Sequence, residues 1–254
     1  MSARPLVAVF AGVDGTGGAG LIADTRAIAC GGGQALTITT AVTAQNLNGV
    51  KACWPLPTAR VRTQFSTLCA TSVDAIKIGV CGNAASVIIE SIRHWRAPTV
   101  WDPVLSPTAG TAFISPTQRV QLVRRLLPHT CVITPNRQEL TELSERRQVI
   151  DGVAVLLDAG ARHVLITDCK KGATVHHALY GNNRQLLWET ATKRRPGNYH
   201  GSGCFFSSLL ATRLAFDDTP AQAADTAHQR TLEAIDNAFS VPTLGKQKLL
   251  SLAP

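Results

Sequence analysis

A short apolar run, Leu6-Val7-Ala8-Val9-Phe10, leads almost at once into a glycine-rich segment, Gly12-Val13-Asp14-Gly15-Thr16-Gly17-Gly18-Ala19-Gly20. The apolar run is typical of a buried parallel strand, and residues 19–29 favour a helix directly after the glycines. Five glycines in nine residues let the backbone approach a ligand closely. The segment has neither the spacing of a dinucleotide fingerprint nor the lysine of a P-loop. We interpret it as a ligand-binding loop, with a plain flexible turn as the alternative.

The rest of the chain repeats this strand–helix pattern. Repeated units of this kind predict a mainly parallel sheet with helices on both faces, and ligands bind outside the carboxyl ends of its strands. No linker-like segment divides the chain, so we expect a single domain over residues 1–254, with about 241–254 as a short tail. The expected strands are 6–10, 36–42, 75–78, 99–101, 131–133 and 164–167, with a hairpin over 174–179 and 185–190. The expected helices are 19–29, 59–70, 87–95, 118–127, 137–143, 149–159, 204–215 and 221–239.

Composition narrows the class of protein. The 254 residues are 45% hydrophobic and 17% charged, enough to bury a substantial core, and no apolar run is long enough for a membrane span. The net charge of +8 is spread over short basic groups without aromatic interleaving, so we interpret it as a solvated surface and expect no nucleic-acid partner. The start of the chain shows no signal-peptide pattern, and the seven cysteines form no C-x-x-C pair. We therefore expect a cytoplasmic protein without a membrane partner.

A second glycine-rich stretch, Asn198-Tyr199-His200-Gly201-Ser202-Gly203-Cys204, runs directly into the apolar segment Phe205-Phe206-Ser207-Ser208-Leu209-Leu210-Ala211. A glycine-rich turn that opens a helix is a ready anion site, because its free N–H groups and the helix dipole favour negative charge. We expect Cys204 in the first helical turn, where the thiol pKa falls below about 8.5. An anion site beside an activated thiol indicates phosphoryl or acyl transfer. His200 is interpreted either as a partner of Cys204 or as a local structural residue, and a buried helix cysteine is the alternative for Cys204 itself.

Polar residues also follow several of the other expected strands. In Thr43-Ala44-Gln45-Asn46, two adjacent amides are suited to the edge of a heterocycle or, equally, to turn capping. Asp102-Pro103 and Thr134-Pro135-Asn136-Arg137-Gln138-Glu139 supply oxygen ligands that suit Mg²⁺ with nucleotide phosphates, although an ordinary helix start also explains the second motif. Ile166-Thr167-Asp168-Cys169-Lys170-Lys171-Gly172-Ala173 is interpreted as a nucleotide border or as a surface turn.

Taken together and in this order, the motifs resemble the ribokinase-like superfamily and, within it, the hydroxymethylpyrimidine/phosphomethylpyrimidine kinases of thiamin biosynthesis. The resemblance runs from about residue 7 to about residue 240 and implies a three-layer α/β/α sandwich. Most of the superfamily carries Asp where this family, like this chain, carries a cysteine. The stretches that carry the resemblance are Gly12–Gly20, Thr43–Asn46, Lys77–Gly79, Asp102–Val104, Thr134–Glu139 and Asn198–Cys204.

The resemblance implies ATP- and Mg²⁺-dependent phosphorylation of 4-amino-5-hydroxymethyl-2-methylpyrimidine, of its monophosphate, or of both, by a homodimer. It makes Cys204 the base that removes the hydroxymethyl proton, and it makes Gly201, Ser202 and Gly203 the anion hole. It places Asp102 and Glu139 at the metal and Gln45 at the aminopyrimidine edge. The implied substrate pocket is Gly12, Asp14, Ala19, Val42, Gln45, Val80 and Val104, and the implied nucleotide residues are Asn136, Thr167 and Gly172.

The chain departs from the family pattern at several positions. Gly15 stands in place of a proline, Val80 in place of a methionine, and Asp168-Cys169 where the family commonly has a phosphate-binding lysine. Lys170 and Lys171 are the candidates to replace that lysine. Three alternatives follow: a pyridoxal or pyridoxine kinase, a non-catalytic vitamin-binding homologue, and a cysteine hydrolase.

Overall fold

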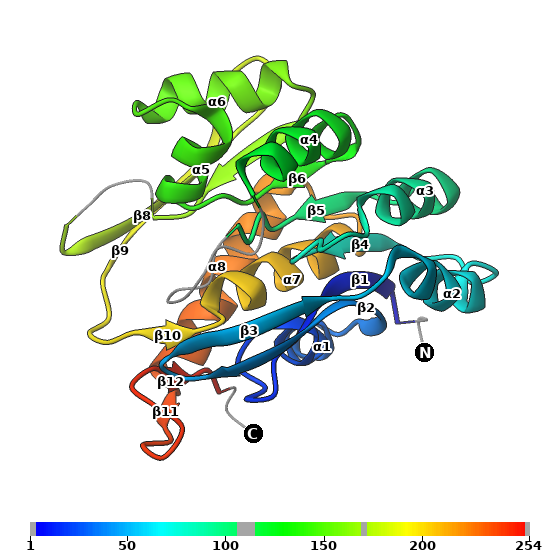
Figure 1. The fold of residues 1–254 in the computed structure, drawn as a ribbon. Helices are drawn as coiled ribbons and strands as arrows, with labels where there is room; N and C mark the ends of the chain where they lie inside the picture. Colours follow the sequence, from blue (N-terminus) through cyan, green and yellow to red (C-terminus); the bar gives the residue numbers. More distant parts are fainter. Residues whose placement is uncertain (1–3, 106–114, 169–171, 252–254) are drawn as a thin grey trace.

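A nine-stranded sheet forms the middle layer of the computed structural model, which describes residues 4–105, 115–168 and 172–251 (Figure 1). The strand order is β3-β2-β1-β4-β5-β6-β7-β8-β9. Neighbours from β2 to β7 run parallel, whereas β3, β8 and β9 are added antiparallel at the two edges. The strands are β1 (Leu6–Val13), β2 (Gln34–Asn46), β3 (Gly49–Pro55), β4 (Ala75–Ile78), β5 (Thr99–Trp101), β6 (Val132–Ile133), β7 (His163–Ile166), β8 (Thr174–Tyr180) and β9 (Leu186–Lys193).

Helices cover both faces of this sheet, so the expected three-layer α/β/α sandwich is confirmed. Helices α2 to α6 pack on one face, and α1, α7 and α8 pack on the other (Figure 1). The helices are α1 (Gly20–Cys30), α2 (Thr58–Leu68), α3 (Ala85–Trp95), α4 (Pro116–Leu126), α5 (Arg137–Ser144), α6 (Val149–Asp158), α7 (Ser202–Leu214) and α8 (Pro220–Asp236), with a 3₁₀ turn over Leu127–His129. Within the described ranges, no helix is long and apolar enough to cross a membrane.

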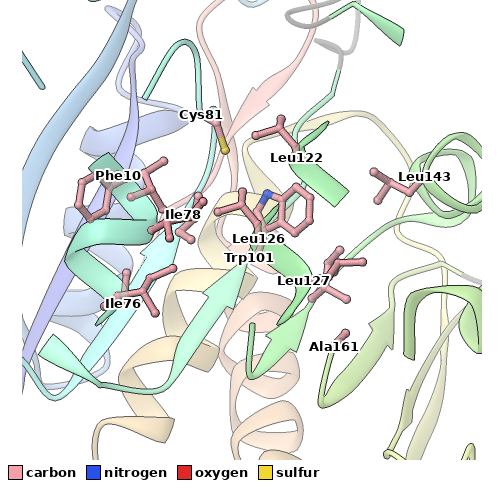
Figure 2. Packing of buried hydrophobic residues seen from close by; sticks show 14 of the residues in the cluster. Phe10, Ile76, Ile78, Cys81, Trp101, Leu122, Leu126, Leu127, Leu143 and Ala161 are labelled. Atoms are coloured by element: carbon pink, nitrogen blue, oxygen red, sulfur yellow. The ribbon is translucent and has the colours of Figure 1, made fainter. Parts of the chain in front are cut away.

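Side chains alternate along each buried strand and so contribute to two hydrophobic cores, one on each face of the sheet. In β1, Phe10 joins the cluster under α2 to α6, whereas Val9 joins the cluster under α1, α7 and α8. Trp101 of β5 lies at the centre of the first cluster, as Figure 2 shows, while the adjacent Val100 enters the second. Each fully buried large side chain contributes about 1.5–3 kcal/mol. The continuous apolar runs in the sequence therefore reflect strands that are buried on both faces.

The antiparallel edge at β2 and β3 differs from expectation. Residues Thr43–Asn46, expected to follow a strand, lie inside β2, which continues to Asn46 and pairs with β3. The pairing supplies backbone partners for these polar residues, so the strand continues where its sequence no longer looks like a buried one. Gln45 therefore stands on a hairpin rather than in a loop.

Residues 241–254 are not a plain tail, because Lys248–Leu249 form strand β12. This strand lies between β10 (Tyr199–His200) and β11 (Phe239–Ser240) in a small second sheet. Leu249 and Leu250 are buried. Strands of two residues are too short to produce a periodic pattern, which is why the sequence does not reveal them.

Candidate active site

A cavity of about 490 Å³ opens at the carboxyl ends of the parallel strands, beside the start of α7. Its position agrees with the rule that ligands bind at this edge of an open α/β sheet. Residues from segments that are far apart in the sequence meet around it. The expected site residues that line it are Gly12, Asp14, Ala19, Gln45, Val80, Asp102, Val104, Asn136, Glu139, Thr167, Gly201, Ser202, Gly203 and Cys204.

Two expected site residues lie elsewhere. Val42 is 41% exposed and pairs with Trp54 across the β2–β3 hairpin, outside the cavity. Side chains alternate along a strand, so the face that carries Thr43 and Gln45 toward the cavity points Val42 away.

Gly172 belongs to an open groove that adjoins the cavity. Asp168 and Arg194 line this groove, and Asn136 borders both it and the cavity. The guanidinium of Arg194 donates to Asp168 at 2.7 Å. Lys170 and Lys171, the candidate replacements for the absent lysine, lie outside the described residues.

The two glycine-rich loops touch each other at the start of α7. Gly201 precedes α7 with a φ of +73°, and a Cβ atom there would collide with the carbonyl oxygen of Gly18. Gly20 has a φ of +58°, and a Cβ atom there would collide with the carbonyl oxygen of Gly12. Both positions combine a left-handed backbone with no room for a side chain. These glycines let the loop after β1 and the loop before α7 form one continuous wall of the cavity.

Cys204 lies in the first turn of α7, as expected, but its pKa is shifted in the opposite direction. Burial is the largest influence and raises the pKa of the thiol, and the charges of Asp102 and Asp24 raise it further. The ammonium of Lys77 and a hydrogen bond from the Gly20 N–H oppose this shift. The expectation of a lowered pKa is therefore wrong, because desolvation of the partly buried thiol outweighs the charge of Lys77 at this helix start. The thiol is protonated at neutral pH when the cavity is empty.

A buried ion network lies beneath Cys204. Lys77, in the middle of β4, has a fully buried side chain whose Nζ lies 2.8 Å from Asp24 Oδ1 and 3.5 Å from Asp102 Oδ2. Burial alone would lower the pKa of Lys77, but the neighbouring carboxylates outweigh it and raise that pKa. The ammonium therefore stays charged, and it joins α1, β4 and β5 at the floor of the cavity.

Helix α7 completes this network with two serines. Ser208 Oγ donates to Asp24 at 2.8 Å, and Ser207 Oγ donates to Asp102 at 3.0 Å. Residues three and four positions apart share a helix face, so Cys204 faces the same network one turn earlier. The thiol thus sits above a buried cluster of one ammonium and two carboxylates, in which Asp24 Oδ2 has no hydrogen-bond partner among the described residues.

Asp102 and Glu139 form an acidic pair that faces the cavity, just after the ends of β5 and β6. Burial, followed by the charge of Asp102, raises the pKa of Glu139 to about 8. Glu139 also takes part in a capping box at the start of α5, because its carboxylate accepts from the Asn136 N–H at 2.9 Å. The ordinary helix-start interpretation is thus confirmed for Glu139, and the capping leaves it on the wall of the cavity.

His200 does not pair with Cys204. Its Nε2 lies 2.7 Å from Asp14 Oδ2, and its Nδ1 lies 3.0 Å from Gln247 Oε1. Hydrogen bonds from His200 and Thr16 hold the pKa of Asp14 below its usual range, although burial raises it. The cysteine-hydrolase alternative therefore loses the base that it required.

Several residues of the cavity and of the buried network beneath it were not expected from the sequence. Lys77 interrupts the apolar strand Ala75–Ile78, and a charge in such a strand is a signal of a buried pair. Ser207 and Ser208 follow Cys204 at helical spacing, which is a second usable signal. Gln247 lines the cavity from a segment with no recognisable pattern, and no sequence signal indicates it.

These features define a small-molecule kinase of the ribokinase-like class, in which the cavity beside Cys204 and the adjoining groove lie on one edge of the sheet. Residues 14–248 match the phosphomethylpyrimidine kinase family, and the chain belongs to that family.

Curated relatives agree with this assignment. A hydroxymethylpyrimidine/phosphomethylpyrimidine kinase of Streptomyces coelicolor is 32% identical over 92% of this chain and 90% of its own length. A relative of the same name from Haemophilus influenzae is 29% identical over 95% of this chain and 94% of its own. The thiamine biosynthesis multifunctional protein ThiED of Corynebacterium glutamicum is 31% identical over 92% of this chain, which spans only 32% of that protein.

Solved structures share the fold. A phosphomethylpyrimidine kinase from Clostridium difficile superposes with a TM-score of 0.76 at 26% identity, over 92% of this chain and all of its own. The pyridoxal kinase of Staphylococcus aureus in complex with pyridoxal gives a TM-score of 0.87 at 24% identity, over 97% of this chain and 93% of its own. At that identity, the second likeness shows the fold alone.

The buried network predicts a large stability effect. Replacing Lys77 with methionine leaves Asp24 and Asp102 without their buried counter-charge, so we expect Lys77→Met to lower the free energy of unfolding by about 3–5 kcal/mol. Denaturant unfolding measures this loss. Lys51→Met on the exposed side of β3 is the matched control and should change stability by less than about 0.5 kcal/mol. Equal losses in the two variants would contradict a paired, buried Lys77.

Proposed function

We propose that this protein phosphorylates 4-amino-5-hydroxymethyl-2-methylpyrimidine on its hydroxymethyl group, its monophosphate on the phosphate group, or both, with ATP as the phosphoryl donor. One observation carries the proposal: a single cavity brings Cys204 and the helix-start amides together with Gln45 on one side and two carboxylates on the other. The names of the relatives that match most of this chain supply the substrate class.

In the proposed reaction, the hydroxymethyl oxygen of the pyrimidine, or a phosphate oxygen of its monophosphate, attacks the terminal phosphorus atom of ATP. A new O–P bond forms, the bond from that phosphorus to the bridging oxygen breaks, and ADP leaves. The backbone N–H groups at Gly201, Ser202 and Gly203 stabilise the charge on the moving phosphoryl group, since they begin α7 without helical partners. The Gln45 amide, which can both donate and accept, pairs with the aminopyrimidine edge. Positioning and charge stabilisation supply most of the catalysis in such transfers.

When the unphosphorylated pyrimidine is the substrate, Cys204 accepts the hydroxymethyl proton in this proposal. Its raised pKa makes the thiolate a strong base once formed, but it also makes the thiolate scarce in the empty cavity. Neutralisation of Asp102 removes one of the charges that raise this pKa, whereas Lys77 remains to stabilise the thiolate. Filling the acidic end of the cavity therefore favours the active form of the base.

The acidic pair fits a divalent cation. Asp102 and Glu139 line one cavity, and the pKa of Glu139 is raised by its burial and, to a smaller extent, by the negative charge of Asp102. The buried Thr134 Oγ1 on the same wall has no hydrogen-bond partner among the described residues. No cluster of three acidic, histidine or cysteine ligands occurs in the described ranges, and Mg²⁺, which retains waters and phosphate oxygens, needs none. When bound, Mg²⁺ would neutralise the phosphate charge.

Asn136, Thr167 and Gly172 are proposed to border the nucleotide. All three line the cavity or the groove that adjoins it, on the side away from Gln45. We therefore propose that the phosphate donor and the acceptor bind at opposite ends of the cavity, with the start of α7 between them.

We also propose a cytoplasmic homodimer. The six cysteines among the described residues form no disulfide, which supports a reducing compartment. Trp54, 57% exposed, lies directly opposite the exposed Val42 on the β2–β3 hairpin. An exposed apolar pair on a sheet edge supports an interface there.

The activity is tested by measuring ADP release with the pyrimidine, its monophosphate and pyridoxal. We expect turnover of a pyrimidine, and a loss in kcat of at least about 10²-fold in Cys204→Ala with little change in substrate binding, because the variant lacks its general base. Cys30→Ala, at the end of α1 and outside the cavity, is the control.

Other outcomes of this assay reject the proposal in distinguishable ways. A higher kcat/KM for pyridoxal would identify a vitamin B6 kinase. Tight binding of the pyrimidine without ATP binding would identify a non-catalytic homologue. If Cys204→Ala lowers stability but not kcat, the thiol contributes only to packing.

The proposed cation site predicts a pH dependence. Glu139 is protonated below about pH 8 in the empty protein, and a divalent cation binds the carboxylate. Mg²⁺ affinity should therefore rise roughly tenfold between pH 6.5 and 8, with proton release on binding at pH 7. Calorimetry in buffers of different ionisation enthalpy measures both effects. Glu139→Gln should bind Mg²⁺ more weakly and without this pH dependence, whereas pH-independent binding by the unmodified protein would contradict the assignment.

The proposed interface predicts a change in oligomeric state. Trp54→Glu places a charge in the apolar pair, so we expect it to shift a dimer toward monomer in sedimentation experiments. Ile150→Glu, 58% exposed on α6, is the matched control and should leave the state unchanged. A monomeric unmodified protein, or equal shifts in both variants, would contradict the proposal.

A further inference from the structure

Residues 244–250 bind both walls of the acceptor half of the cavity. On one side they join the tip of the β2–β3 hairpin, where the Leu47 N–H donates to the Leu244 carbonyl at 2.9 Å and the Gln247 N–H donates to the Leu47 carbonyl at 3.2 Å. Gly245 permits this close approach, because a Cβ atom there would lie 2.6 Å from the Leu47 carbonyl carbon. The hairpin that carries Gln45 is therefore held by backbone bonds from this segment.

On the other side the same segment joins the loop before α7. Strand β12 pairs in parallel with β10, which sets Leu249 beside His200. Gln247 is only 8% exposed, and its Oε1 lies 3.0 Å from His200 Nδ1. The opposite ring nitrogen, Nε2, lies 2.7 Å from Asp14 Oδ2. Gln247, His200 and Asp14 thus form a continuous chain of side chains along the cavity wall.

Asp14, the last of these three hydrogen-bonded side chains, organises the first glycine-rich loop. Its carboxylate accepts from the Thr16 N–H at 2.8 Å and from the Ala19 N–H at 2.9 Å, and it is 1% exposed. Gly18 lies against the ring of His200 and the side chain of Leu249, so closely that no Cβ atom fits there. The conformation of the loop therefore depends on where the His200 ring is held.

We propose that Gln247 is a positioning residue for the acceptor substrate, acting through His200 on Asp14 and the glycine-rich loop. Since the Asp14 carboxylate only accepts, His200 Nε2 donates to it, and the Gln247 side chain holds the ring from the opposite nitrogen, Nδ1. The two contacts together fix the orientation of the ring against Gly18. This inference rests on the proposed function, because it assigns the loop to the acceptor side of that reaction.

The test is a kinetic double-variant cycle. Gln247→Met keeps the length of the side chain but removes the hydrogen bond, so we expect the KM for the pyrimidine to rise about 5- to 10-fold while the KM for ATP and kcat stay within about twofold. His200→Asn should have a larger effect of the same kind. If Gln247 acts through His200, the double variant will be no worse than His200→Asn alone. Gln185→Met, an exposed glutamine in the β8–β9 turn, is the matched control.

A substrate-free measurement separates this inference from the proposed function. The ¹⁵N signals of the His200 ring, assigned by their loss in His200→Asn, should shift in Gln247→Met and not in Gln185→Met. An unchanged ring signal, additive effects in the cycle, or equal rises in the KM for ATP and for the pyrimidine would each overturn the inference. If the unmodified protein phosphorylates no pyrimidine, the proposed function fails. If the His200 ring signal also stays unchanged in Gln247→Met, the contact between Gln247 and His200 is rejected as well.

Discussion

The single ammonium of Lys77 is the constraint on which the site depends. It is fully buried, and its partners come from α1 and from the end of β5. The serines of α7 attach the fourth element to the same carboxylates. A buried charge is tolerated only with partners in good geometry, so these elements must occupy fixed relative positions. The position of α7 then sets both the proposed anion-binding turn and Cys204.

The same constraint explains the behaviour of the thiol. An exposed helix start would lower the pKa of Cys204, as its sequence position suggests. Enclosure by the network and by the glycine-rich loops instead makes burial the dominant influence. In the proposed reaction, Cys204 would therefore act as a base only after the negative charge near it has been neutralised.

The elements with strong patterns were predictable from the sequence, and those held by tertiary pairing were not. Ala75–Ile78 and Thr99–Trp101 form strands with the expected bounds, because both are continuous apolar segments buried on both faces. Most of the cavity wall followed from the polar residues after such strands. Val42 was misplaced because the alternation of β2 continues beyond its apolar part, and Gln247 was missed because only its packing against His200 and Leu47 gives it a place.

The late position of β12 in the chain has a consequence for synthesis. The strand β1 and its glycine-rich loop emerge from the ribosome well before Leu249, which packs against that loop. Domains often begin to fold while the chain is still growing. Much of the sheet can assemble at that stage, but the core under α1, α7 and α8 lacks Leu250, and the first loop lacks a contact, until residues 249 and 250 have been released. A nascent chain can thus acquire its architecture before it acquires a finished pocket.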